Sequence, residues 1–219
     1  MRILTQANAR VLWYVQSEDL NPNGLDLLPI YVALKTRYEF RIFPSRPEEF
    51  QPTSGGVVFA KGSFPLADGQ IVEIVRFEIF NDGLMVDTRA STEISEDILK
   101  DILRYLSRTH RLTFDQTMVK RKAYVSEVVA TTEVNLGALN PKLQQFSTLL
   151  SAACGQNLDF QPDQIRFGTD VAQSQFSLKF RFERREGFDF NEKRYYSLAP
   201  TTTEKHKQLL DELEAILSV

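Results

Sequence analysis

The sequence predicts an α+β protein built as a tandem pseudo-repeat. Each half is expected to form an antiparallel sheet of about three to five strands, with a short helix and a long C-terminal amphipathic helix packed on one face. Three observations predict this fold: short motifs recur at an offset of 110 residues, a long amphipathic helix ends each half, and a hairpin signal precedes each of these helices. The two expected units are residues 1–112 and 113–219.

The recurring motifs are a Tyr-Val pair and a Phe-Gln-Pro triplet. Tyr14-Val15 matches Tyr124-Val125, and Phe50-Gln51-Pro52 matches Phe160-Gln161-Pro162. Self-similarity at a fixed offset is the sequence signature of a duplicated structural unit. Because the matches are short, two unrelated α+β halves of similar length are the alternative interpretation.

In the first half, residues 10–15 predict a strand and residues 29–38 predict a helix that starts near Pro29. A strand at 55–64 and a hairpin at 72–88 follow, with Asp82-Gly83 expected to supply the positive φ of a tight turn. Residues 95–106 predict the long helix, capped by Ser95. Its apolar stripe is Ile98, Leu99, Ile102, Tyr105 and Leu106.

The second half repeats this order. Residues 120–134 predict a strand, and residues 140–154 predict a helix with Pro141 at its first position. A strand at 164–171 and a hairpin at 175–196 follow, the latter turning at Gly187 and alternating Phe176, Leu178, Phe180 and Phe182 with polar residues. Thr201 and Glu204 predict a capping box for the last helix. Its expected stripe is Leu209, Leu210, Leu213, Ile216 and Leu217.

This order of elements resembles two known architectures. One is the TATA-binding protein, in which two repeats form a curved sheet under helices. The other is the small α+β fold of type III secretion chaperones. The resemblance concerns element order alone, so no functional residues are carried over from either family. What it implies, by analogy of element order alone, is a nucleic-acid-binding saddle.

Composition narrows the class of protein. The chain is 42% hydrophobic and 25% charged with a net charge of -3, which gives no overall attraction to nucleic acid or anionic membranes. Its N-terminus lacks a usable signal sequence, and it has no apolar run of membrane-spanning length. One cysteine permits no internal disulfide and fits a reducing compartment. We therefore expect a soluble cytoplasmic protein without a membrane partner.

The residues that most often carry catalysis or bind metals are few. With two histidines, one cysteine and no tight acidic cluster, the sequence predicts neither a metal site nor a cofactor. We expect Cys154 to be a buried small residue at a helix end and His206 to be solvated in the first turn of the last helix. His110 is expected to end the first long helix.

Two polar segments are candidate functional sites. Residues 87–93 link a strand to a helix and crowd together Asp87, Arg89, Ser91 and Glu93, which form a candidate polar site; a capped turn is the alternative. The 175–196 hairpin mixes cations with aromatic residues, as nucleic-acid binders do. Its candidate basic-aromatic surface is Lys179, Arg181, Arg184, Arg185, Lys193 and Arg194. Interleaved Glu183, Glu186, Asp189 and Glu192 favour a salt-bridged hairpin instead.

Three classes of function follow. A non-enzymatic protein-interaction protein is favoured, acting as an adaptor, a chaperone-like factor or a subunit of a larger assembly. It would engage a protein partner or self-associate through a sheet face, a strand edge or a helix groove. The first alternative is a nucleic-acid-binding protein that uses a curved sheet face. The second is an enzyme or ligand binder with a pocket between the sheet and a long helix.

Overall fold

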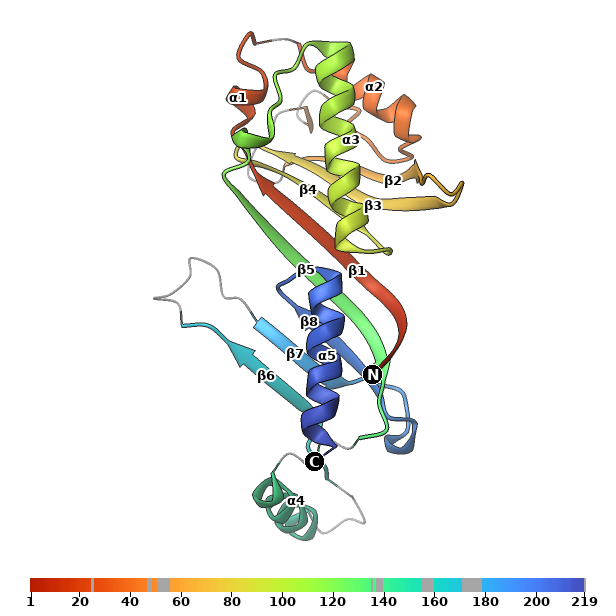
Figure 1. Cartoon of the computed structure of the whole chain (residues 1–219), viewed down its shortest axis with the longest axis vertical. Coiled ribbons are helices and arrows are strands. Elements are labelled where there is room, and N and C mark those ends of the chain that lie inside the picture. The colour runs from red at the N-terminus through yellow and green to blue at the C-terminus, as the bar shows by residue number, and fades with distance from the viewer. Residues whose placement is uncertain are drawn as a thin grey trace. The chain divides into compact units, whose positions relative to one another are not determined.

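The computed structural model describes residues 1–24, 26–46, 49–50, 56–134, 136, 140–154, 160–170 and 179–218. Over these residues the chain is α+β, with eight strands and five α-helices (Figure 1). The first-half elements are β1 (Arg2–Tyr14), α1 (Ser17–Leu20), α2 (Leu28–Tyr38), β2 (Val57–Pro65), β3 (Ile71–Phe80), β4 (Gly83–Thr88) and α3 (Thr92–His110). The second-half elements are β5 (Arg121–Thr131), α4 (Pro141–Ala153), β6 (Gln164–Gly168), β7 (Lys179–Arg184), β8 (Arg194–Ala199) and α5 (Thr203–Leu217).

The strands form one antiparallel sheet in the order β2-β3-β4-β1-β5-β8-β7-β6. The strands of the first half therefore follow the order β2-β3-β4-β1, and those of the second half the order β6-β7-β8-β5. Central strand β4 pairs with β1 through Arg10 and Asp87 and with β3 through Phe77 and Val86. In the second half, β7 pairs with both β6 and β8.

The chain divides into two compact units, which we call the larger and the smaller unit. The larger unit comprises Asn8–Ser126 and Thr201–Thr203. The smaller unit comprises Met1–Ala7, Glu127–Pro200 and Glu204–Val219. The predicted boundary near residue 112 stays a prediction.

The core of the larger unit is extensive and rich in aromatic residues. Helix α3 buries Ile98, Leu99 and Ile102 in the same cluster as Phe59 and Phe77 of the sheet. Aromatic rings in this cluster have centroids 5.3 to 6.4 Å apart and are tilted or stacked, which are arrangements that aromatic pairs prefer. Apolar burial on this scale is the main term that stabilises the unit.

The smaller unit has a shorter set of buried apolar residues. Phe182 of β7 and Tyr195 of β8 stack with centroids 4.6 Å apart, and Leu210 and Leu217 of α5 join them. The alternation predicted for β7 holds at Phe182, which is buried, while Phe176 and Leu178 lie outside the described residues.

The long helices begin at other residues than the sequence indicates. Ser91, not Ser95, caps α3, because the Ser91 side chain accepts a hydrogen bond from the Ile94 backbone N–H. Ser95 is instead fully buried inside the helix. Helix α5 begins at Thr203, so Thr201 lies two residues before its first turn.

The expected stripe of α5 is also wrong at two positions. Leu209 and Ile216 are 45% and 66% exposed, whereas Leu210 and Leu217 are buried. The buried stripe starts earlier, at Thr203 and His206, which precede Leu210 at helical spacing. Because Thr203 and His206 are polar, apolar periodicity alone does not identify them as core positions.

Of the two glycines predicted to adopt a positive φ in hairpin turns, one does so and the other does not. Gly187 has a φ of 82°, as the predicted hairpin requires, whereas Gly83 does not adopt a positive φ. Gly83 is needed for close approach, since a Cβ built there would lie 2.8 Å from the Trp13 carbonyl oxygen on β1.

Candidate functional site

Asp87 of the candidate polar site forms a cross-strand ion pair. Arg10 on β1 donates from Nε to Asp87 Oδ1 at 2.7 Å and from Nη2 to Asp87 Oδ2 at 2.8 Å. The Asp87 side chain is 7% exposed and that of Arg10 is 42% exposed. A bidentate guanidinium–carboxylate pair of this kind fixes the geometry of both side chains. Both oxygens of Asp87 are thus engaged in holding β4 against β1.

The other members of the polar site have separate surroundings. Ser91 caps α3, and Glu93 lies exposed in the first turn of that helix. Arg89 is exposed just beyond β4. Ser91 and Glu93 occupy positions that a helix start favours for its own stability. The cap formed by Ser91 fits the capped-turn alternative, whereas Asp87 is engaged within the sheet.

The basic-aromatic residues lie on and around the β7–β8 hairpin. Arg181 forms an ion pair with Glu183 and lies over the Tyr196 ring, and Arg194 forms an ion pair with Glu192. Lys193 pairs with Glu133. Arg185 and Arg194 both lie over the Phe188 ring, at 5.3 and 4.4 Å from its centroid. Lys179 and Arg184 begin and end β7, the first exposed and the second half-buried.

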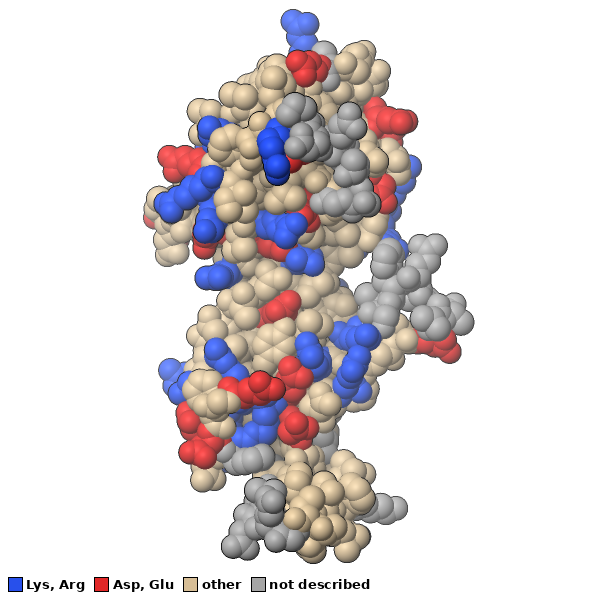
Figure 2. Space-filling model, turned by 180° about the vertical axis from the view of Figure 1, so that it is seen from behind, with Lys and Arg blue, Asp and Glu red and all other residues tan. Residues whose placement is uncertain are grey.

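These pairings give Arg181, Arg185, Lys193 and Arg194 acidic or aromatic neighbours. In Figure 2, Lys and Arg side chains alternate with Asp and Glu side chains over the visible face. Binding of a nucleic acid backbone depends on a net positive groove, and adjacent carboxylates oppose it. The geometry of this hairpin therefore favours the salt-bridged interpretation.

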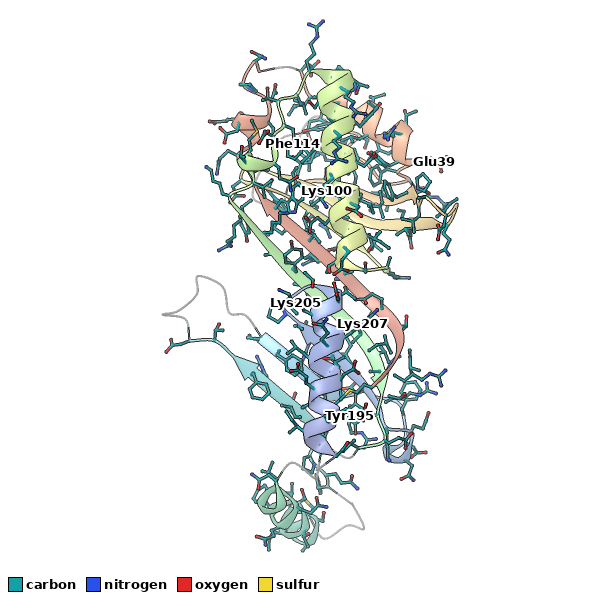
Figure 3. All side chains as sticks on the ribbon, in the orientation of Figure 1. Glu39, Lys100, Phe114, Tyr195, Lys205 and Lys207 are labelled. Atoms are coloured by element: carbon teal, nitrogen blue, oxygen red, sulfur yellow. The ribbon has the colours of Figure 1, made fainter. Side chains whose placement is uncertain are left out.

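His206 is buried, not solvated. Its ring is 0% exposed, and its Nε2 lies 2.9 Å from Ser197 Oγ on β8. Lys205 and Lys207 on either side of it are exposed (Figure 3). Burial lowers the pKa of His206 to about 4, so the imidazole is neutral at neutral pH.

The structure contradicts one of the remaining residue predictions and confirms another. Cys154 is exposed and free, so its expected burial is wrong. His110 ends α3 as expected. Over the described residues, His, Cys, Asp and Glu side chains form no group of three or more that could hold a metal ion. Among the described helices, none combines the length and the apolar character needed to span a membrane.

The sequence reasoning missed the exposed apolar face of α4. Leu143, Phe146 and Leu149 are 49%, 61% and 68% exposed, and all three belong to one helix of 13 residues. Exposed large apolar residues that gather on one element mark interaction sites, whereas scattered ones do not. We call Leu143, Phe146, Leu149 and Leu150 the α4 face.

Comparison of α4 with α2 shows that the corresponding apolar residues of α2 are buried. Helix α2 carries Tyr31, Leu34 and Tyr38, which are 4%, 0% and 1% exposed. The same spacing recurs 112 residues later as Leu143, Phe146 and Leu150, and Pro29 likewise matches Pro141. A spacing of three and then four residues places side chains on one side of a helix. The side that α2 buries therefore corresponds to a side of α4 on which Leu143 and Phe146 are exposed and Leu150 is half-buried. The repeated spacing was the signal in the sequence for this face, but not for its exposure.

A cavity of about 200 Å³ lies in the larger unit. Ile102, Leu103 and Leu106 of α3 form one wall, and Phe77 and Leu84 of the sheet form another. The rest of the lining is Ser17, Glu18, Leu20, Asn21, Leu27, Ile30, Tyr31, Ile79 and Leu112. The candidate polar residues Asp87, Arg89, Ser91 and Glu93 are not among those that line it.

No protein-family model matches the chain, and no curated protein matches it in sequence.

Proposed function

We propose that the chain is a non-enzymatic protein-interaction protein, an adaptor or a subunit of a larger assembly, and that it binds its partner through the α4 face. The observation that carries this proposal is the contrast between α2 and α4, whose apolar residues share one spacing but differ in burial. The binding mode is a helix placed in a groove, with anchors at i, i+3 and i+7. The cytoplasm is the compartment we propose, because exposed Cys154 persists as a free thiol where the environment is reducing.

The surroundings of α2 indicate what the partner presents. Tyr31 meets Phe50 and Phe59 at centroid distances of 5.9 and 5.7 Å, and Tyr38 meets Phe40 at 6.0 Å. A helix with the same anchor spacing calls for a receptor of the same chemistry. We therefore propose a partner protein with a groove lined by aromatic and aliphatic side chains.

Charge supports the same partner. Lys142 is the sole charged residue within α4, in a chain that is 25% charged. Interface cores are depleted in charged residues, since each buried charge must be desolvated. A low-charge helix suits an uncharged groove and gives no basis for binding an acidic or a basic surface.

A tandem duplication underlies this proposal. It is supported by the common element order and by the strand orders β2-β3-β4-β1 and β6-β7-β8-β5. It is also supported by the long helices, in which the fourth residue hydrogen-bonds a hydroxyl of the preceding strand: Ser95 to Thr88, and His206 to Ser197. In this account α4 is the second copy of a docking helix.

The test uses two charge substitutions on the α4 face. Phe146→Asp with Leu149→Asp should leave the fold intact, because both side chains are exposed. A partner that copurifies with the wild-type chain is first purified, and its affinity for each variant is then measured by calorimetry. Phe146 is one of the three anchors, and a buried aromatic anchor contributes about 2 kcal/mol or more, so we expect binding to weaken at least about thirtyfold.

The matched control is Val32→Asp on α2, which alters an apolar residue that is 55% exposed on a helix already docked. The proposal expects V32D to bind as wild type does. Equal loss in both variants, or none in the α4 variant, would overturn it. A concentration-dependent dimer of the purified chain that the α4 substitutions abolish would instead assign the face to a second copy.

A further inference from the structure

The cavity in the larger unit is lined by none of the residues of the α4 face. Of the residues that line it, Leu20, Ile102, Leu103 and Leu106 are buried apolar side chains with at most 7% exposure. Their alkyl groups provide dispersion contacts and no hydrogen-bonding groups. The interior of the cavity therefore suits an apolar group.

The walls of the cavity are fixed by backbone hydrogen bonds. Ser17 N–H donates to the Asn81 carbonyl at 2.9 Å, which holds α1 to the β3–β4 turn. Thr113 N–H donates to the Leu20 carbonyl at 2.9 Å, which holds α1 to the segment after α3. A space between elements tied together at both ends does not close by movement of α1 alone, and a largely preformed cavity is typical of ligand sites.

The size of the cavity selects a small ligand. An apolar cavity of roughly 150 Å³ in another protein stays dry and binds benzene. A cavity of about 200 Å³ accommodates one six-membered ring with a short substituent.

The polar lining is confined to one side. Ser17, Glu18 and Asn21 provide it, and Glu18 is exposed. The Tyr31 hydroxyl donates to the Phe50 carbonyl at 3.1 Å, and burial raises its pKa to about 12, so it stays neutral. The lining residues include no Lys, Arg or His, and Glu18 is their sole carboxylate. The formal charge of the lining is therefore negative, which favours a cationic over an anionic group at the rim.

We propose that this cavity binds a small aromatic amine, with the ring in the apolar interior and the ammonium group at the Glu18 rim. The ring provides the main binding energy through apolar burial. The ammonium sets the preference among ligands, because an exposed charge pair contributes a modest but salt-dependent term.

The experiment compares three probes of similar size on the full chain: 2-phenylethylamine, phenylacetate and ethylbenzene. Binding is followed by calorimetry and by intermolecular NOEs from the probe ring to the methyl groups of Leu103 and Leu106. We expect the amine to bind about fivefold more tightly than phenylacetate at low salt. Glu18→Gln should narrow this ratio, and so should added salt, whereas Asp19→Asn on the neighbouring exposed residue should leave it unchanged.

A second variant tests the cavity itself. Ile79 lines it and is half-buried, so Ile79→Trp places an indole in the space and should abolish binding of all three probes. Saturable binding with ring-to-methyl NOEs supports the site. Absence of saturable binding by every probe, tighter binding of phenylacetate, or NOEs to methyl groups elsewhere would overturn it, and none of these outcomes bears on the α4 face.

Discussion

Thr92 and Thr203, the first residues of the two long helices, are joined by reciprocal hydrogen bonds. Thr92 N–H donates to Thr203 Oγ1 at 3.0 Å, and Thr203 N–H donates to Thr92 Oγ1 at 2.7 Å. Both residues belong to the larger unit and are at most 2% exposed. A helix start leaves its first N–H groups without partners inside the helix, and each threonine satisfies this need for the other. Under the proposed duplication, Thr92 and Thr203 occupy equivalent positions, each at the start of the long helix of its half.

Breaking the hydrogen bonds between these two threonines should destabilise the protein. Thr203→Val removes the acceptor and leaves the Thr92 N–H buried without a partner, so the free energy of unfolding should fall by about 1–3 kcal/mol. Thr203→Ser retains the hydroxyl and should cost less. Urea titration followed by circular dichroism measures both changes. A T203S variant as unstable as T203V would show that the methyl group, not the hydrogen bond, matters.

Breaking the pair between Arg10 and Asp87 should destabilise the larger unit. Arg10→Ala leaves the Asp87 carboxylate 7% exposed without its bidentate donor, and we expect a loss of about 2–3 kcal/mol. The fluorescence of Trp13, the one tryptophan of the chain and fully buried, reports unfolding of this unit. If Asp87→Asn instead left stability unchanged while abolishing partner binding, Asp87 would belong to a functional site.

The stability of the smaller unit should fall in mild acid because of His206. Its pKa lies at about 4 in the folded chain and at about 6.5 when solvated, so the unfolded chain binds the proton more tightly. The stabilisation is present above pH 6.5 and is lost as the pH falls toward 4, amounting to about 3 kcal/mol. Unfolding free energies of wild type and His206→Gln between pH 7.5 and 4 test this prediction. Parallel pH profiles for the two proteins would contradict it.

Two strand glycines should respond differently to alanine. A Cβ at Gly62 of β2 would lie 2.5 Å from the ring of Phe40, which is buried against other aromatic residues, whereas Gly168 of β6 has no atom within 4 Å of that position. Gly62→Ala should cost about 1–3 kcal/mol through displacement of Phe40. Gly168→Ala should change stability by less than about 0.5 kcal/mol. Equal thermal shifts for the two variants would refute the packing assigned to β2.

The sequence predicted the class of elements better than their contacts. Alternation and hairpin signals identified the α+β fold, because side-chain periodicity follows directly from backbone geometry. The stripe of α5 was misplaced since buried His206 occupies a core position next to exposed Leu209. Hydrophobicity alone does not distinguish a polar residue with a buried partner, here Ser197, from a solvated one.

The candidate sites were less predictable. Asp87 stood out in the sequence as polar, but its partner Arg10 lies 77 positions earlier and is brought to it by strand register. The exposure of the α4 face could not be predicted either, although the spacing of its apolar residues is visible in the sequence. Its spacing resembles that of a docked helix, and periodicity shows which residues share a face without showing what covers it.

Photo-crosslinking from the α4 face tests the central claim most directly. A photoreactive phenylalanine analogue is placed at position 146 of α4 or at position 32 of α2, both exposed apolar sites. The α4 face as a partner-binding surface predicts a single crosslinked partner from position 146 and none from position 32. Crosslinking from position 32 alone, or equally from both positions, would contradict it.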